Sequence, residues 1–67
     1  MSVKEYMQNL YRDFAFYGFT TCPLTDSEIM ILFGLGYSVS DAYGIGCDVS
    51  AGFYFDEAVR GFIYEKR

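Results

Sequence analysis

Three glycines, each followed directly by an aromatic residue, divide this chain into short segments. The pairs are Gly18-Phe19, Gly36-Tyr37 and Gly52-Phe53. Each follows a stretch whose apolar residues recur at helical spacing, and glycine readily takes the left-handed backbone conformation that ends a helix. Three such stops in 67 residues leave room for four short helices within one domain.

Each of the four predicted helices has its own start signal. Ser2 to Glu5 and Thr25 to Glu28 are capping boxes, in which a hydroxyl oxygen and a glutamate accept hydrogen bonds from free backbone amides of the first turn. The other two starts place an apolar residue first, then a capping side chain, then an acid. In Val39-Ser40-Asp41 the predicted cap is Ser40, and in Phe55-Asp56-Glu57 it is Asp56.

The spacing of the apolar residues gives the predicted helix bounds. The helices are expected over about Val3 to Tyr17, Asp26 to Leu35, Asp41 to Ala51 and Glu57 to Glu65. The first carries one apolar stripe, made of Val3, Met7, Leu10, Phe14 and Tyr17 and widened by Tyr6. The second is apolar almost all round, which is typical of a helix buried centrally among others. The sequence therefore predicts an all-α fold, a compact bundle of four short helices joined by Gly-aromatic turns, in a single domain over residues 1–67.

Two features weaken this prediction. Gly44, Gly46 and Gly61 lie inside predicted helices, where each costs about 1 kcal/mol relative to alanine, so they indicate close helix contacts or a short or broken third helix. The segment from Phe14 to Tyr17 has an aromatic content that also suits a β-strand. A small α+β fold is therefore the structural alternative.

The two cysteines, Cys22 and Cys47, are interpreted as small apolar core residues, with a disulfide as the alternative. A secreted chain of this size is normally richer in cysteine, so a reducing cytoplasm is the expected location. The segment from Ser2 to Asn9 is polar, and no signal peptide is predicted. The longest apolar run, Ile29 to Gly36, is far short of the roughly 20 residues of a membrane span, so no membrane contact is predicted.

No catalytic motif stands out. The chain has no histidine, which is the commonest general base and metal ligand. The carboxylates of Asp26 and Glu28 fall in a first helical turn, where capping and the helix dipole explain them without acid-base chemistry. We therefore predict a protein that is not an enzyme and that has no cofactor, no catalytic residues and no metal site.

The charge pattern is one-sided. Between Arg12 and Arg60 the chain has no Lys, Arg or His, yet it has seven carboxylates. They are Asp13, Asp26, Glu28, Asp41, Asp48, Asp56 and Glu57. DNA-binding proteins need cations to neutralise phosphates, so direct binding of nucleic acid is not expected. An acidic surface attracts basic partners instead.

The predicted function is therefore protein binding, with a basic protein or nucleoprotein complex as the partner. The predicted partner-binding acids are Asp13, Glu28, Asp41, Asp48, Asp56 and Glu57, and the predicted aromatic anchors are Tyr37, Tyr43 and Tyr54. The alternative is a homo-oligomeric structural or adaptor protein, for example a homodimer. In that case an aromatic face pairs with itself, and the acidity only maintains solubility.

The chain is short, acidic and rich in Tyr and Phe, a combination that also occurs in a known class of proteins. It resembles the small inhibitors that phages and mobile elements encode, such as anti-CRISPR proteins and DNA mimics. The resemblance covers the composition of the whole chain and includes no diagnostic motif, so it carries over no residue. It implies a basic nucleic-acid-binding host complex as the partner, blocked access of DNA to that complex, and the host cytoplasm as the location.

Overall fold

The computed structural model describes residues 1–65, with side chains as far as Phe62. In this part the chain forms helices and no strand: α1 (Val3–Phe16), α2 (Asp26–Gly34), α3 (Val39–Ser50) and α4 (Phe55–Glu65). The predicted all-α bundle of four short helices is confirmed. The α+β alternative is wrong for the described residues, since the aromatic segment that suited a strand belongs to α1 as far as Phe16.

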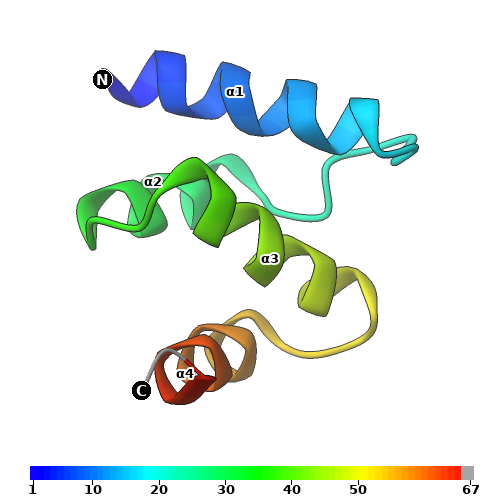
Figure 1. Ribbon diagram of the computed structural model, residues 1–67, viewed down its shortest axis with the longest axis vertical. Coiled ribbons are helices and arrows are strands. Elements are labelled where there is room, and N and C mark those ends of the chain that lie inside the picture. Colours follow the sequence, from blue (N-terminus) through cyan, green and yellow to red (C-terminus); the bar gives the residue numbers. More distant parts are fainter. Residues whose placement is uncertain (66–67) are drawn as a thin grey trace.

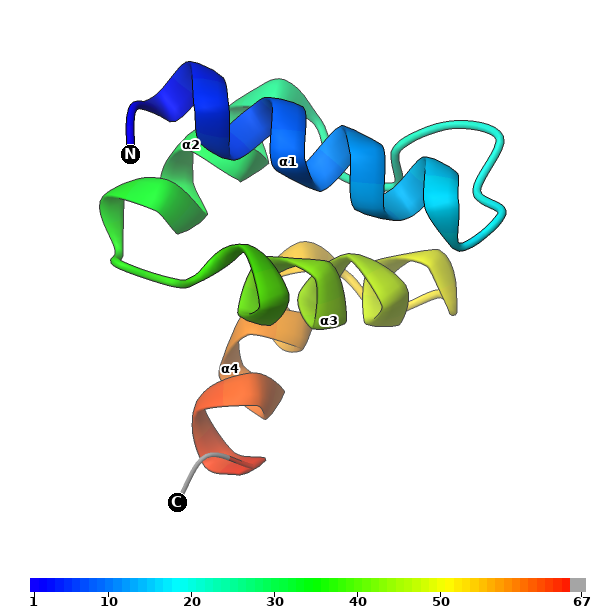
Figure 2. The same cartoon turned by 45° about the horizontal axis from the view of Figure 1, so that its top comes forward.

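The helices stack in an order that leaves α4 at one end. Helices α1 and α3 run side by side in the same direction, and α2 makes the return between them against α1 (Figure 1). Helix α4 packs mainly on α3, and it runs steeply away from α3 (Figure 2). Much of the surface of α2 and α4 therefore has no neighbour within the chain.

The two predicted capping boxes are present, whereas the other two predicted caps lie two residues too late in the chain. The hydroxyls of Ser2 and Thr25 each accept from the amide three residues on, and the glutamate at that position accepts from the cap amide. Helix α3 is capped by Ser38, whose Oγ accepts from the Asp41 amide at 3.1 Å, so Ser40 is not the cap. Its sequence Ser-x-x-Asp places an acid where a capping box has its glutamate.

Helix α4 also begins earlier than predicted. Its first residue is Phe55, so Asp56 lies inside the first turn and is not the cap. The backbone amide of Tyr54 donates to Glu57 Oε1 at 3.1 Å, which is the glutamate half of a capping box. The two errors have different causes. At α3 a second serine, Ser40, follows two positions after the true cap, whereas the residue before α4 is Tyr54, whose backbone amide and not its side chain makes the capping hydrogen bond.

The three glycine stops end their helices in the same way. Gly18, Gly36 and Gly52 have φ of 91°, 86° and 111°, in the left-handed region. At each stop the aromatic amide donates to the carbonyl five residues back, and the glycine amide donates to the carbonyl three residues back. These are Schellman motifs, and the predicted helix stops are confirmed.

One small core holds the helices together. Its fully buried members are Tyr6, Leu10, Phe14, Leu24, Ile29, Leu32, Ala42, Ile45 and Ala58. The α1 stripe is centred on Tyr6, Leu10 and Phe14, so the predicted inclusion of Tyr17, which is 63% exposed, is wrong. The prediction that α2 is buried all round is also wrong, because only Ile29 and Leu32 of α2 are fully buried.

Only one helical glycine is required by close packing. A Cβ on Gly46 would lie 2.3 Å from Cζ of Phe14, so helices α1 and α3 approach each other through this glycine. At Gly44 the nearest atom is 3.9 Å away, an ordinary contact, and at Gly61 nothing lies within 4 Å. Close helix contact is thus confirmed at Gly46, and α3 is a continuous helix of 12 residues.

Three tyrosines make the fold sensitive to alkali, and burial raises the pKa of one of them, Tyr43, to about 12. Burial, with the charge of Asp41 as a smaller cause, raises the pKa of Tyr6 to about 12. A hydrogen bond from its hydroxyl to Asp26 raises the pKa of Tyr11 to about 12. Folding therefore favours the neutral phenols. Their contribution to stability is complete below the ordinary pKa of 10 and is lost as the pH rises towards 12.

We expect the free energy of unfolding to fall between pH 10 and 12, while Tyr6, Tyr11 and Tyr43 ionise. Denaturant titrations followed by circular dichroism at several pH values in this range measure the fall. A Tyr11→Phe variant should show a shallower pH dependence, since it has no phenol to ionise. An unchanged slope in that variant would contradict the role of Tyr11.

The cysteines are free in this fold. Cys22 and Cys47 are both half-buried, neither is part of a disulfide, and Cys22 packs against the core. Burial raises the pKa of the Cys22 thiol, the effect of an apolar environment. None of the helices over residues 1–65 is long and apolar enough to cross a membrane.

Candidate protein-binding site

The joint between α3 and α4 differs from the other two Schellman turns in the residue that faces its aromatic side chain. In this motif the residue after the glycine commonly packs on the residue five positions earlier. Phe19 packs edge-to-face on Phe14 in this way, with ring centroids 5.2 Å apart. At the third turn the earlier residue is an acid, Asp48, and Phe53 stays 56% exposed.

Phe53 lines a pocket together with two acidic side chains. The pocket has a volume of about 190 Å³ and is lined by Asp48, Phe53, Glu57, Ala58 and Gly61. We call it the acidic-aromatic pocket. Helix α3 provides Asp48 near its end, and α4 provides Glu57 in its first turn, so the turn at Gly52 brings the two acids to one place. Gly61 adds no side chain, which keeps the pocket open.

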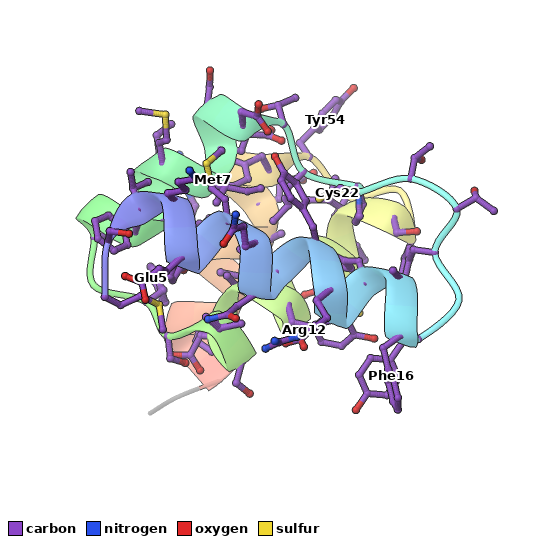
Figure 3. The ribbon with its side chains drawn as sticks, turned by 90° about the horizontal axis from the view of Figure 1, so that it is seen from above. Glu5, Met7, Arg12, Phe16, Cys22 and Tyr54 are labelled. Atoms are coloured by element: carbon purple, nitrogen blue, oxygen red, sulfur yellow. The ribbon has the colours of Figure 1, made fainter. Side chains whose placement is uncertain are left out.

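Tyr54 stands beside the pocket and projects into solvent. Its side chain is 79% exposed, and its backbone amide donates to Glu57 Oε1 at 3.1 Å. Figure 3 shows Tyr54 pointing outward at one edge of the molecule, with Phe16 pointing outward at the opposite edge. The hydrogen bond keeps the Glu57 carboxylate near the start of α4, next to the exposed rings.

The chemistry of this pocket matches a cationic side chain. Carboxylates form charge-assisted hydrogen bonds with guanidinium or ammonium groups, and the face of an aromatic ring attracts the same cations. An exposed Phe and Tyr also supply large apolar area for the stem of an arginine or lysine. No Lys or Arg of the described chain lines the pocket.

The structure places three of the nine predicted partner-binding residues at this joint: Asp48, Glu57 and Tyr54. Of the other acids, Asp13 and Asp41 are half-buried on α1 and α3, and Asp56 is exposed on the opposite flank of α4. Glu28 is engaged in the capping box of α2, where its Oε1 accepts from the Thr25 amide at 2.8 Å. These four do not gather at the pocket.

The two remaining predicted anchors, Tyr37 and Tyr43, are half-buried and contact other rings. Tyr37 meets Phe62 edge-to-face with centroids 5.6 Å apart, and Tyr43 lies 5.0 Å from Phe14. Their rings take part in packing within the chain. Among the predicted tyrosine anchors, Tyr54 is the one whose ring is largely exposed.

Phe53 was not among the binding residues predicted from the sequence, although the residues that precede it indicate its exposure. Phe53 was interpreted only as the aromatic of a helix stop. The residues five positions before the three aromatics are Phe14, Leu32 and Asp48. At the third stop this position has an acid in place of an apolar residue. The pattern therefore predicts that Phe53 lacks the apolar contact that the other two aromatic side chains have.

Over the described residues, no group of three or more acidic or cysteine side chains gathers closely enough to hold a metal ion. When the chain is compared with known protein families, with curated proteins and with solved structures, no match is found.

Proposed function

We propose that this protein is a non-enzymatic interaction module that binds a basic, nucleic-acid-handling protein and inhibits it by blocking access of DNA, in the manner of an anti-CRISPR protein or DNA mimic. The observation that carries the proposal is the acidic-aromatic pocket, where Asp48 and Glu57 flank the exposed ring of Phe53. The site of action is the cytoplasm of the cell that contains this partner.

The charge distribution supports a basic partner. No cation lies between Arg12 and Arg60 in the sequence, and the described residues that line the pocket include two acids and no Lys or Arg. Such a field raises the rate of encounter with a basic surface and repels nucleic acid. The bound protein would occupy a site whose arginines and lysines otherwise contact phosphates.

The test compares two double variants that remove the same charge. Asp48→Asn with Glu57→Gln alters the pocket, and Asp26→Asn with Glu28→Gln alters the start of α2. The glutamates are matched because Glu28 and Glu57 both accept a hydrogen bond from the amide three residues earlier. An asparagine at position 26 keeps an oxygen that can accept from the Tyr11 hydroxyl. Glutamine can replace glutamate in that role, so the helices should keep their caps.

We expect the pocket variant to weaken binding to an immobilised arginine-rich peptide about tenfold more than the α2 variant, at low salt, by surface plasmon resonance. Phe53→Ala should weaken binding to a similar extent without changing the net charge. When the partner has been captured from host cells and loaded with duplex DNA, adding the native protein should displace the DNA from the partner. Adding the pocket variant should not displace it. Equal effects of the two double variants would mean that binding depends on net charge alone and would overturn the proposed site.

A further inference from the structure

A second exposed apolar surface lies on α2 and on the flank of α4 away from the acidic-aromatic pocket. The side chains of Met30 and Ile31 on α2 and of Leu35 at its C-cap are 55%, 51% and 62% exposed. Single exposed apolar residues are ordinary, but Ile31 and Leu35 lie four positions apart, line the same surface and form a patch. This is the surface that the sequence led us to expect in the interior.

The patch continues into a groove between the two helices. The groove has a volume of about 350 Å³ and is lined by Ile31, Leu35, Phe55, Asp56, Val59 and Arg60. We call it the α2–α4 groove. Its apolar floor comes from both helices, and its two charged residues lie four positions apart on α4.

The charges of this groove differ from those of the pocket on the other flank. Asp56 and Arg60 are both exposed, and they cancel each other's charge. A groove with no net charge gives a basic partner no electrostatic advantage. A two-fold interface, by contrast, needs a surface that is complementary to itself, since residue i of one copy meets residue j of the other and j meets i. One acid and one cation on the same groove meet that requirement.

We infer that the α2–α4 groove binds a second copy of this chain, with Asp56 of each copy facing Arg60 of the other across a two-fold axis. The apolar side chains of Ile31 and Leu35 meet their counterparts at the centre. A stable interface needs about 800 Å² from each copy, roughly a sixth of the 4540 Å² of accessible surface, and therefore has to extend over more than one helix, as the groove does.

The size of the chain favours the same arrangement. Chains below about 70 to 80 residues have a core that supplies only a few kcal/mol, and many add a disulfide, a metal, an oligomer or unusually dense helix packing to it. The cysteines here are free, and no metal-holding cluster occurs among the described residues. Self-association covers the apolar face of α2 and supplies the missing burial. It is independent of the proposed function, because the two surfaces lie on opposite flanks of α4.

The test uses the whole chain in sedimentation equilibrium over a wide range of concentration. We expect a monomer–dimer equilibrium, and Leu35→Gln should raise its dissociation constant about tenfold or more, since it removes an apolar contact from each copy. A wild-type chain that stays monomeric up to about 1 mM would overturn the inference.

Charge-reversal variants of Asp56 and Arg60 test the proposed pairing directly. Asp56→Arg alone and Arg60→Asp alone should each be monomeric, since each places like charges opposite each other. An equimolar mixture of the two should form heterodimers, because every pair is then opposite in charge, and this outcome also shows that both variants are folded. Dimers that persist in each single variant would place the interface elsewhere and overturn the inference.

A matched control separates the two surfaces. The variant Asp48→Asn with Glu57→Gln, which alters the acidic-aromatic pocket, should dimerise like the native chain. Loss of its dimer would place self-association at that pocket and overturn the groove. Normal dimers together with unchanged peptide binding would instead refute the proposed function alone.

Discussion

Gly46→Ala should lower the free energy of unfolding by about 1–3 kcal/mol, the usual cost of adding a methyl group to a packed core. The new Cβ would lie 2.3 Å from Cζ and 2.9 Å from Cε1 of Phe14, distances that real Cβ atoms essentially never show. The ring has no free space to move into, since it is 1% exposed and contacts Phe19 and Tyr43. Urea unfolding followed by circular dichroism measures the loss.

The matched control is Gly61→Ala in α4. Alanine is the better helix former by about 0.5–1 kcal/mol, and nothing lies within 4 Å of the new Cβ, so this variant should be more stable than the native chain. The same substitution thus has opposite signs at two helical positions. A loss of stability at both would show that the effect is not due to the Phe14 contact.

A double variant tests the named contact directly. Phe14→Leu removes the three ring atoms that the Gly46 Cβ would meet, so Gly46→Ala should cost much less in that background. We expect a coupling free energy of about 1–3 kcal/mol, as is typical of residues in contact. Strictly additive effects would contradict the close approach of α1 and α3 at this glycine.

The features that the sequence predicted best are those set by nearest neighbours in the chain. Gly18, Gly36 and Gly52 end their helices as expected, because a left-handed residue depends on its own backbone. The caps at Ser2 and Thr25 depend on contacts three residues away and were also predicted correctly. Where two polar residues competed, as at Ser38 and Ser40, the local pattern did not decide which hydroxyl begins the helix.

The features that the sequence did not predict depend on contacts between distant segments. Helix α2 is apolar on all sides, so its periodicity contains no information on which face meets α1. The structure exposes Ile31 and Leu35 and buries Ile29 and Leu32. In the same way, Asp48 and Glu57 come together only because of how α4 turns back on α3. The exposure of Phe53, by contrast, is indicated by the acid five positions before it in the sequence.

Leu32→Ala should leave much of the chain unfolded at room temperature. Leu32 is 0% exposed, and removing a buried leucine side chain costs about 2–5 kcal/mol through lost burial and the cavity left behind. A core of this size rarely supplies more than about 3–5 kcal/mol, so the loss approaches the total stability. Alanine keeps the helical propensity of α2, so the effect arises from packing. Circular dichroism and urea titration measure it.

Leu35→Ala is the control at the C-cap of the same helix, three residues away and 62% exposed. In dilute solution, where the chain is monomeric, its effect on the free energy of unfolding should stay within about 0.5 kcal/mol. At high concentration it should become destabilising, because the native chain then gains stability from dimerisation by mass action and the variant gains less. A large loss for Leu35→Ala in dilute solution would mean that this side of α2 packs within the chain. The expected result is that Leu35→Ala loses stability only at high concentration, whereas Leu32→Ala loses much stability at every concentration. This result would assign the inner face of α2 to the core and its outer face to the second copy.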